Sequence, residues 1–534
     1  MILQKSAIAA ALALSLLPCC AASAASPASN SAVTTAVTYT GTEIQFSDSG
    51  ITSAASDGVE IDGTVLTIKE PGTYLLSGTC ADGSIKVKKG TTGVTLVLNG
   101  LTLTSETTAP IICAKSTEVS IVAAANTENT LTDTENNNAD DGGAEAENAV
   151  IKCKDGSTVT LCGTGTLNVI ANGKNGIKSG ASTESEGDAS LTIRELTLNI
   201  AAPVNDAVNA EAALNVESGT LTIAAGDDAL HCDNAMNIGA ESTAGPSITI
   251  TTCCEGLEGA AVNVYSGNVT IKSTDDCINA ANPSLSGYSD TLNISGGTIV
   301  AYTTSGDGFD SNGDITISGG TVAVWTANAA DNSPLDADGT VTISGGTVLA
   351  AGGSGGMGMN LSAQQPCVTF GSTGGMMGGK GSGMGGQRQP PDMQNFDGQN
   401  IEKPDTQNMP GQDFGGFGGA ASLMAENTAF SILDAQGNTL YSGTARCGTS
   451  FLLFSSPELS EGDSCTLSVD GTDTTADVQT GTISSGMGFP GGSRHGNGNF
   501  GNGNFPGGMG GQRPDWNFDS NGNGGKSTEN AQAK

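Results

Sequence analysis

A short pattern recurs along the middle of the chain. Acidic residues or their amides come first, an apolar residue follows, and an alternating segment with a Ser-Gly turn completes the unit, as in "GDGFDSNGDITISGGT" at 306–321. Internal similarity with a period of about 20–50 residues is typical of solenoids and propellers. The apolar residues of successive units are separated by 21 to 31 residues, and they are Val150, Ile177, Val208, Leu230, Leu257, Ile278, Phe309 and Leu335.

The segments between these residues alternate apolar and polar side chains with a period of two, as strands do. Examples are "SGNVTIKS" at 266–273 and "SGGTVAVW" at 318–325. They lack helical periodicity, the Leu and Asn spacing of leucine-rich repeats, and the four longer strands of a propeller blade. We therefore predict an all-β fold, a right-handed parallel β-helix, in which each coil of two or three short strands lies on the previous coil.

The first 25 residues have the features of an export signal. Lys5 is their only charge, "AIAAALALSLL" is a short apolar run, and "ASA" at 22–24 provides a small-residue cleavage site. We expect a signal peptide over 1–25 and a secreted or cell-surface protein. A lipoprotein anchor at Cys19 or Cys20 is an alternative, although Pro18 fits that pattern badly. No later segment is long and apolar enough to span a bilayer.

Composition divides the rest of the chain into four parts. The β-helix is expected over 40–356, followed by a Gly- and Met-rich linker without fixed structure over 357–421. Alternation returns at 422–480, which predicts a small β-sandwich-like module, and the Gly- and Asn-rich tail over 485–534 is expected to be disordered.

Charge and cysteine content limit the partners. Asp and Glu number 55 against 20 Lys and Arg, a formal net charge of -35, so nucleic acid is excluded as a partner and cations are favoured. No CxxC pair with a matching second pair supports zinc, and most cysteines are expected to be small core residues. Cys447 and Cys465 are a candidate disulfide in the C-terminal module.

Acidic residues recur at fixed positions beside the apolar column. Equivalent positions of adjacent coils lie about 4.8 Å apart, where carboxylates repel one another and raise each other's pKa. A Ca²⁺ ion between coils would remove this penalty, because it takes six to eight hard oxygen ligands in flexible geometry. The alternative is that these Asp and Asn residues only form turns. The candidate calcium ligands are Asp227, Asp228, Glu255, Glu258, Asp275, Asp276, Asp307 and Asp310.

A second column ends the Gly-led strands and contains Lys272, Tyr302 and Trp325. If these side chains face outward on adjacent coils, the two rings offer flat apolar faces to sugar C–H groups and the lysine pairs with a uronate. The alternative is that both rings cover a turn or pack under the linker.

Eight segments, in chain order over about 40–356, resemble the clostridial family of secreted carbohydrate-binding proteins with a pectate-lyase-like parallel β-helix. This resemblance implies calcium at the acidic turns and binding of plant cell-wall polysaccharide, cellulose or acidic glycans such as polygalacturonate and pectin, without cleavage. His231 and Cys232 depart from the plainer polar pair of that family. The segments are "GVTLVLNGLTLTS" (93–105), "APIICAKSTEVSIVAAANTENTLTD" (109–133), "GKNGIKSG" (173–180), "DDALHCD" (227–233), "CEGLEG" (254–259), "DDCINAAN" (275–282), "GDGFDSNG" (306–313) and "SPLDADGTVTISGGTVLAAG" (333–352).

Two other functions stay open. A polysaccharide lyase acting on uronate polymers needs a base for the C5 proton, commonly Arg or Lys beside calcium. Within 150–356 the only arginine is Arg194, and none of the lysines stands in an acidic turn. A structural cell-surface adhesin also fits the Gly-rich segments. Non-catalytic polysaccharide binding needs only cations and an exposed sugar-binding surface, so the sequence favours it.

Overall fold

The computed structural model describes residues 38–55, 57–140, 142–180, 189–282, 290–327, 332–353, 360–371 and 422–484. Throughout these ranges the chain consists of strands, turns and bends, without an α-helix. Within the same ranges no helix has the length and apolar character needed to cross a membrane. The predicted all-β class is confirmed. The predicted signal peptide, most of the predicted linker and the C-terminal tail lie outside the described residues.

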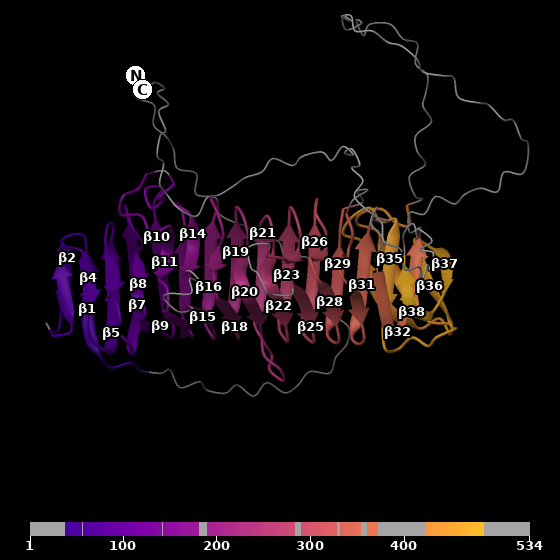
Figure 1. The fold of residues 1–534 in the computed structure, drawn as a ribbon, viewed down its shortest axis with the longest axis horizontal. Helices are drawn as coiled ribbons and strands as arrows, with labels where there is room; N and C mark the ends of the chain where they lie inside the picture. Colours follow the sequence, from indigo (N-terminus) through magenta and orange to yellow (C-terminus); the bar gives the residue numbers. More distant parts are fainter. Residues whose placement is uncertain are drawn as a thin grey trace, which may run out of the picture. The chain divides into compact units, whose positions relative to one another are not determined.

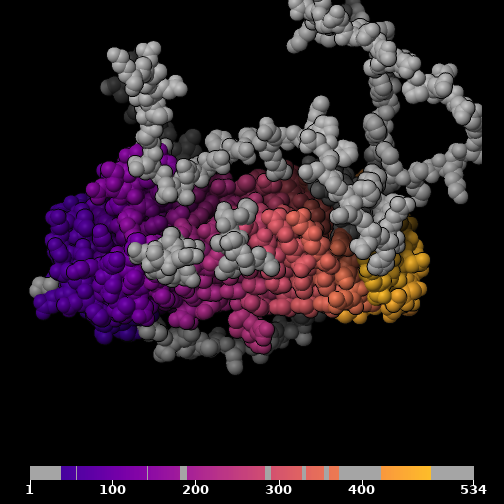
Figure 2. Space-filling model, in the orientation of Figure 1, coloured from indigo at the N-terminus to yellow at the C-terminus, as the bar shows by residue number. Residues whose placement is uncertain are grey.

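Successive coils stack on one another in sequence order, as the colours in Figures 1 and 2 show. Their strands pair in parallel. This is the predicted parallel β-helix. Each complete coil contributes one strand to each of three parallel sheets, which we number 1 to 3. Sheet 1 contains β4 (Val65–Ile68), β6 (Ser84–Val87), β8 (Ile111–Cys113), β11 (Ala149–Cys153), β14 (Asn175–Ser179), β17 (Val208–Ala210), the first halves of β20 (Leu230–Ile238) and β22 (Leu257–Val264), β24 (Ile278–Ala280) and β27 (Phe309–Ser311).

The other two sheets continue each coil. Sheet 2 contains β9 (Glu118–Ala123), β12 (Thr158–Gly163), β15 (Ser190–Ile193), β18 (Ala213–Val216), the second halves of β20 and β22, β25 (Thr291–Ile294), β28 (Asp314–Ile317), β30 (Val341–Ile343) and the start of β32 (Asn360–Gly371). Sheet 3 contains β10 (Glu128–Asp133), β13 (Thr166–Ile170), β16 (Thr197–Ala202), β19 (Thr220–Ala225), β21 (Ser247–Thr252), β23 (Asn268–Ser273), β26 (Thr298–Thr303), β29 (Thr321–Trp325) and β31 (Thr347–Gly352).

The first coils are less regular. β5 (Gly72–Cys80) and β7 (Val94–Ser105) are long enough to serve both sheet 2 and sheet 3. β1 (Thr42–Ser47) pairs with β5 in parallel and with β2 (Gly50–Ser53) in antiparallel fashion. β3 (Val59–Asp62) forms a second antiparallel hairpin with β4. At the N-terminal end of the stack, β1 and β4 therefore each have an antiparallel partner.

The predicted apolar column lies in the interior, one residue per coil. Strand pairing places Ile177 beside Val208, and the column continues through Leu230, Leu257, Ile278 and Phe309, all fully buried. Leu335 joins it through an isolated parallel bridge to Phe309. Burying each such side chain contributes about 1.5–3 kcal/mol.

The prediction is wrong by one residue at the start of this column. Ile151, not Val150, pairs with Ile177, and Lys152 therefore pairs with Lys178. Val150 and Ile151 are both fully buried. Two adjacent apolar residues follow the acidic segment 133–148, so taking the apolar residue after an acidic turn left the alignment ambiguous there.

The β-helix extends beyond its predicted C-terminal boundary at residue 356. Residues 360–371, assigned to the linker from the sequence, form β32, which pairs in parallel with β30. β35 (Phe451–Ser455) pairs antiparallel with β31 and β32, and β38 (Gln479–Ser484) pairs antiparallel with β32. The C-terminal segment therefore completes the last coils rather than standing apart from them.

Four further strands form an antiparallel sheet, in the order β34 (Thr439–Thr444), β33 (Ala429–Leu433), β36 (Ser464–Val469) and β37 (Thr472–Asp477). A second hydrophobic core lies between the last coils and this segment, with Trp325 and Phe370 against Phe430. The rings of Trp325 and Phe430 meet edge to face, with their centroids 5.8 Å apart. The predicted Cys447–Cys465 disulfide is absent, because both are free thiols and the Cys447 thiol donates to the carbonyl of Thr326 at 2.7 Å.

Trp325 is expected to be a structural residue. Trp325→Ala removes a buried ring from the core beneath the C-terminal sheet, and such truncations cost about 3–5 kcal/mol. We therefore expect a clear fall in the urea midpoint of unfolding. Lys272→Ala, two coils earlier in the same register column but exposed, is the matched control and is expected to leave the midpoint unchanged. Equal midpoints for the two variants would contradict this account.

Candidate cation sites on the acidic ladder

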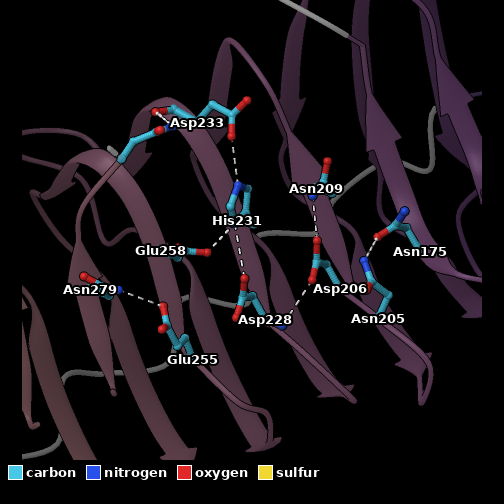
Figure 3. Close-up of polar contacts among 11 residues, drawn as sticks. Asn175, Asn205, Asp206, Asn209, Asp228, His231, Asp233, Glu255, Glu258 and Asn279 are labelled. Atoms are coloured by element: carbon cyan, nitrogen blue, oxygen red, sulfur yellow. Dashed lines mark hydrogen bonds and ion pairs between the residues drawn. The ribbon is translucent and has the colours of Figure 1, made fainter. Parts of the chain in front are cut away.

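Two columns of polar side chains run beside the apolar column of sheet 1 (Figure 3). Pairing of the strands places one member of each column on every coil, so neighbouring members come from adjacent coils. We call the two columns together the acidic ladder. The turn column is Asp206, Asp228, Glu255, Asp276 and Asp307, and the strand column is Asn209, His231, Glu258, Asn279, Asp310 and Asp336.

Three aspartates of the turn column form hydrogen bonds with the backbone of the next coil. Asp276 Oδ1 accepts the backbone N–H of Asp307 at 2.5 Å, and Asp307 Oδ1 accepts that of Ser333 at 2.5 Å. Asp206 Oδ1 accepts the N–H of Asp228 at 3.2 Å in the same way. Each carboxylate thus pairs a backbone donor of the following coil and keeps a second oxygen for other partners. At Asp206 the second oxygen also has a protein partner, because Asn209 Nδ2 donates to its Oδ2 at 2.6 Å. Turn chemistry therefore explains both oxygens of Asp206 but only one oxygen of Asp276 and Asp307.

His231 provides a positive charge inside the ladder. Its Nδ1 donates to Asp228 Oδ2 at 3.2 Å and contacts Glu258 Oε2, and its Nε2 donates to Asp233 Oδ1 at 2.9 Å (Figure 3). Burial lowers the pKa of His231, but the hydrogen bonds to the three carboxylates outweigh it and raise the pKa well above its ordinary value. Although burial acts in the opposite direction, the His231 hydrogen bond lowers the pKa of Glu258. The charged imidazole therefore offsets part of the negative charge of these three carboxylates.

Three groups of ladder side chains bring their ligand atoms within 4.8 Å of one another. They are Asp206 with Asp228 and His231, Asp228 with Glu255 and Glu258, and Asp307 with Asp310 and Asp336. We number these clusters 1 to 3. Cluster 1 contains the protonated imidazole, whereas clusters 2 and 3 are made only of carboxylates.

Five of the predicted calcium ligands stand in these clusters, namely Asp228, Glu255, Glu258, Asp307 and Asp310. The other three, Asp227, Asp275 and Asp276, belong to none of the clusters found among the described residues. Asp227 and Asp275 precede the turn column by one position and are exposed. Asp206, His231 and Asp336 are additional members. The register rule that identified Asp310 also identifies Asp336, since it follows Leu335, the next residue of the apolar column.

The carboxylates of the ladder are hard to ionise without a counter-charge. Burial, followed by repulsion from Glu258 and Asp228, raises the pKa of Glu255 to about 9. Burial likewise raises the pKa of Asp307 to about 7, with Asp336 and Asp310 adding to it. The pKa of Asp310 rises to about 6 for the same reasons. These groups lie close enough for a divalent cation between them to favour their ionised forms.

A buried amide oxygen supports the same interpretation. Asn279 lies between Glu258 and Asp310 in the strand column. Its Nδ2 donates to Glu255 Oε2 at 3.1 Å, whereas its Oδ1 is buried and has no hydrogen-bond partner in the described part of the chain. An unpaired buried acceptor is costly. Carboxylate and amide oxygens are the donor set that Ca²⁺ takes, so the residues present fit this ion.

The comparisons with known proteins agree with the resemblance drawn from the sequence. The profile of a family described as "Carbohydrate-binding domain-containing protein" matches residues 62–356, more than half of the chain. The chain belongs to this carbohydrate-binding domain family. The acidic ladder and its three clusters lie entirely within the matched range.

Two relatives are similar over part of their length. A protein of Acetivibrio thermocellus with the same description is 35% identical over 136 residues, which are 25% of this chain and 47% of the relative. The chain therefore spans about half the length of this curated relative. A solved structure described as "Structure of the polysaccharide lyase-like protein from C. thermocellum, Gadolinium derivative" is 25% identical, covers 57% of this chain and 93% of that chain, and has a TM-score of 0.32.

The predicted aromatic strip does not form a sugar-binding surface. Lys272, Tyr302 and Trp325 are in register on adjacent coils, as expected. However, only 2% of Trp325 is exposed, because the C-terminal sheet packs over it, and Tyr302 packs partly buried against the same core. The prediction of an open stacking strip is therefore wrong at its aromatic end, and Lys272 alone is exposed.

The ladder makes stability without calcium depend on pH. The pKa values of Asp276 and Asp307 rise from 3.8 to about 7, so the folded chain retains protons that the unfolded chain has released. The free energy of unfolding in chelator is therefore expected to fall as pH rises from about 4 to 7, and Glu255 extends the fall toward 9.

Thermal unfolding at pH 5, 7 and 9, in chelator and in excess calcium, measures this effect. Calcium at about 100 times its dissociation constant stabilises a one-site protein by about 2.7 kcal/mol, so it should restore most of the loss at high pH. A melting temperature in chelator that rises steadily from pH 5 to 9 would rule out this electrostatic account.

Proposed function

We propose that the protein is a secreted, calcium-dependent and non-catalytic binder of plant cell-wall polysaccharide, either cellulose or acidic glycans such as pectin. The family assignment supports carbohydrate binding. The calcium dependence rests on two all-carboxylate clusters, each formed across two adjacent coils. They are Asp228 with Glu255 and Glu258, and Asp307 with Asp310 and Asp336. Calcium bound there would stabilise the coils and offer open coordination positions to hydroxyl or carboxylate oxygens of a glycan.

The strand column favours acidic glycans in particular. On the two coils before Asn209 the same register position holds Lys152 and Lys178, and the first carboxylate of the column is Glu258. Lys178 Nζ lies 3.6 Å from Glu211 Oε1, whereas burial, followed by the charge of Lys178, lowers the pKa of Lys152. A uronate polymer lying along this column would meet lysines at one end and bound calcium at the other. Both groups attract carboxylates.

The lowered pKa of Lys152 favours a second candidate function, a polysaccharide lyase, because β-elimination from a uronate requires a base. Lys152 stands three coils before Asp228 of cluster 2, so calcium bound there would lie apart from it. Eliminative cleavage creates an unsaturated product and raises the ultraviolet absorbance of polygalacturonate, whereas a binder co-sediments with the polymer and leaves the absorbance unchanged. A structural adhesin gives neither response.

Removal of calcium is the direct test of the proposed function. Chelator is expected to weaken binding to polygalacturonate by at least about tenfold, because the cation bridges protein and polymer carboxylates. Asp307→Asn combined with Asp310→Asn removes two charges of cluster 3 and is expected to reproduce much of this loss. Affinity electrophoresis in gels containing the polymer measures both effects.

Asp275→Asn is the matched control. It neutralises a carboxylate of an acidic turn that is exposed and outside the three clusters. Its mobility in the gel should follow that of the wild type in the presence of calcium. Equal losses for the control and the double variant would mean that overall negative charge, rather than the cluster, governs binding, and binding that is indifferent to chelator would overturn the calcium dependence.

A further inference from the structure

A second polar ladder lies on sheet 2, outside the acidic ladder. It consists of Asn215, Asn237, Asn263 and Asn293, one on each of four consecutive coils and in register with one another. The Nδ2 of each donates to the Oδ1 of the preceding one, at 2.9 Å for Asn237 to Asn215 and 3.1 Å for the two following bonds. We call this row the amide ladder.

The amide ladder has unused hydrogen-bonding capacity. A side-chain amide offers two N–H donors and two acceptor lone pairs. At Asn237 and Asn263 the ladder itself uses one donor and one lone pair, and these side chains make no other hydrogen bond in the described part of the chain. Both are partly exposed. The ladder therefore presents oriented donor and acceptor pairs to solvent, repeated at the strand spacing of about 4.8 Å.

The surface around the amide ladder is flat and uncharged on one side. Two positions before the first three asparagines, the outward residues are Ala213, Ala235 and Ala261, and Thr291 continues this row before Asn293. The alanine methyl groups leave room for an extended chain to lie close to the sheet. Tyr265 follows Asn263 by two positions, directly after the end of β22, and is partly exposed. A tyrosine ring combines an apolar face with a polar hydroxyl.

A cleft opens at one end of the row. The loop between β20 and β21, over 239–246, projects from the stack of coils (Figures 1 and 2). Asn215, Asn237, Gly239 and Thr243 contribute to the lining of a cleft of about 600 Å³ beneath it, which lies within the usual range for ligand sites. The loop thus forms one side of a cleft next to the first two asparagines of the amide ladder.

These features define the chemistry of a ligand. Donor and acceptor pairs match the hydroxyl groups of a sugar, and the lack of charge on the ladder gives no preference for a uronate. Because the pairs recur coil after coil, the ligand that uses them is an extended polymer. We propose that the amide ladder, Tyr265 and the adjoining cleft form a calcium-independent binding surface for a neutral polysaccharide chain lying across the coils. This inference deepens the proposed function and rests on it.

Two variants of the ladder test the proposal. Threonine already occupies this column at Thr192 and Thr316 on neighbouring coils, so Asn237→Thr with Asn263→Thr keeps residues that the fold accepts. The double variant removes both exposed amide pairs and is expected to weaken co-sedimentation with microcrystalline cellulose about tenfold, in chelator as in calcium. Tyr265→Ala is expected to weaken it as well.

The chain provides a matched control on another sheet. Asn199 Nδ2 donates to Asn168 Oδ1 at 2.9 Å on sheet 3, which is the same type of bond away from the cleft. Asn199→Thr removes one such bond, against three in the double variant, so it should lower the melting temperature less and leave cellulose binding intact. Equal loss of binding in this control, or cellulose binding of the double variant within about twofold of the wild type, would overturn the proposal.

The two proposals fail in different ways. Wild-type protein that binds polygalacturonate with calcium but not cellulose overturns the amide-ladder site alone. Wild-type protein that binds neither polymer overturns the proposed function. Retained calcium-dependent binding of polygalacturonate by Asn237→Thr with Asn263→Thr, together with lost cellulose binding, supports two separate surfaces.

Discussion

The structure depends on the in-register parallel pairing of successive coils. Because side chains of equivalent positions then lie one strand spacing apart, each choice of residue type becomes a column rather than a single contact. Apolar columns fill the interior, as Ile177 and Val208 do, and polar columns form ladders on the outside. Stability and binding therefore arise from the same geometry.

Columns of like charge carry an electrostatic penalty, and the chain meets it in three ways. Backbone N–H groups of the next coil pair with Asp206, Asp276 and Asp307. The imidazole of His231 pairs with Asp228, Asp233 and Glu258 and offsets part of their charge. The two carboxylate clusters supply hard oxygen donors that fit a divalent cation, and within them Glu255, Asp307 and Asp310 have raised pKa values. The amide ladder of sheet 2 avoids the penalty altogether, because each amide is both donor and acceptor to its neighbours.

The sequence was sufficient to predict the structure where each coil repeats the previous one in register. It was insufficient where residues far apart in the chain contact one another. The register from Ile177 onward could be predicted because one large apolar residue follows each turn, and Val150 was misplaced where two adjacent large apolar residues offer alternative registers. The burial of Trp325 depends on a sheet formed far along the chain, around Phe430, which no local pattern identifies. The role of His231 required knowing which carboxylates of the next coil surround it. The amide ladder was visible as a recurring Asn in short strands, but its hydrogen bonds and cleft were not.

The central claim is that the acidic ladder holds calcium at defined clusters. A crystal structure of the protein grown with calcium, with anomalous scattering used to locate the ions, tests it most directly. The account predicts ions about 2.3–2.6 Å from carboxylate oxygens of Glu255 and Glu258 and of Asp307, Asp310 and Asp336. Carboxylates in these clusters bonded only to protein and water, with calcium absent or bound elsewhere, would contradict it.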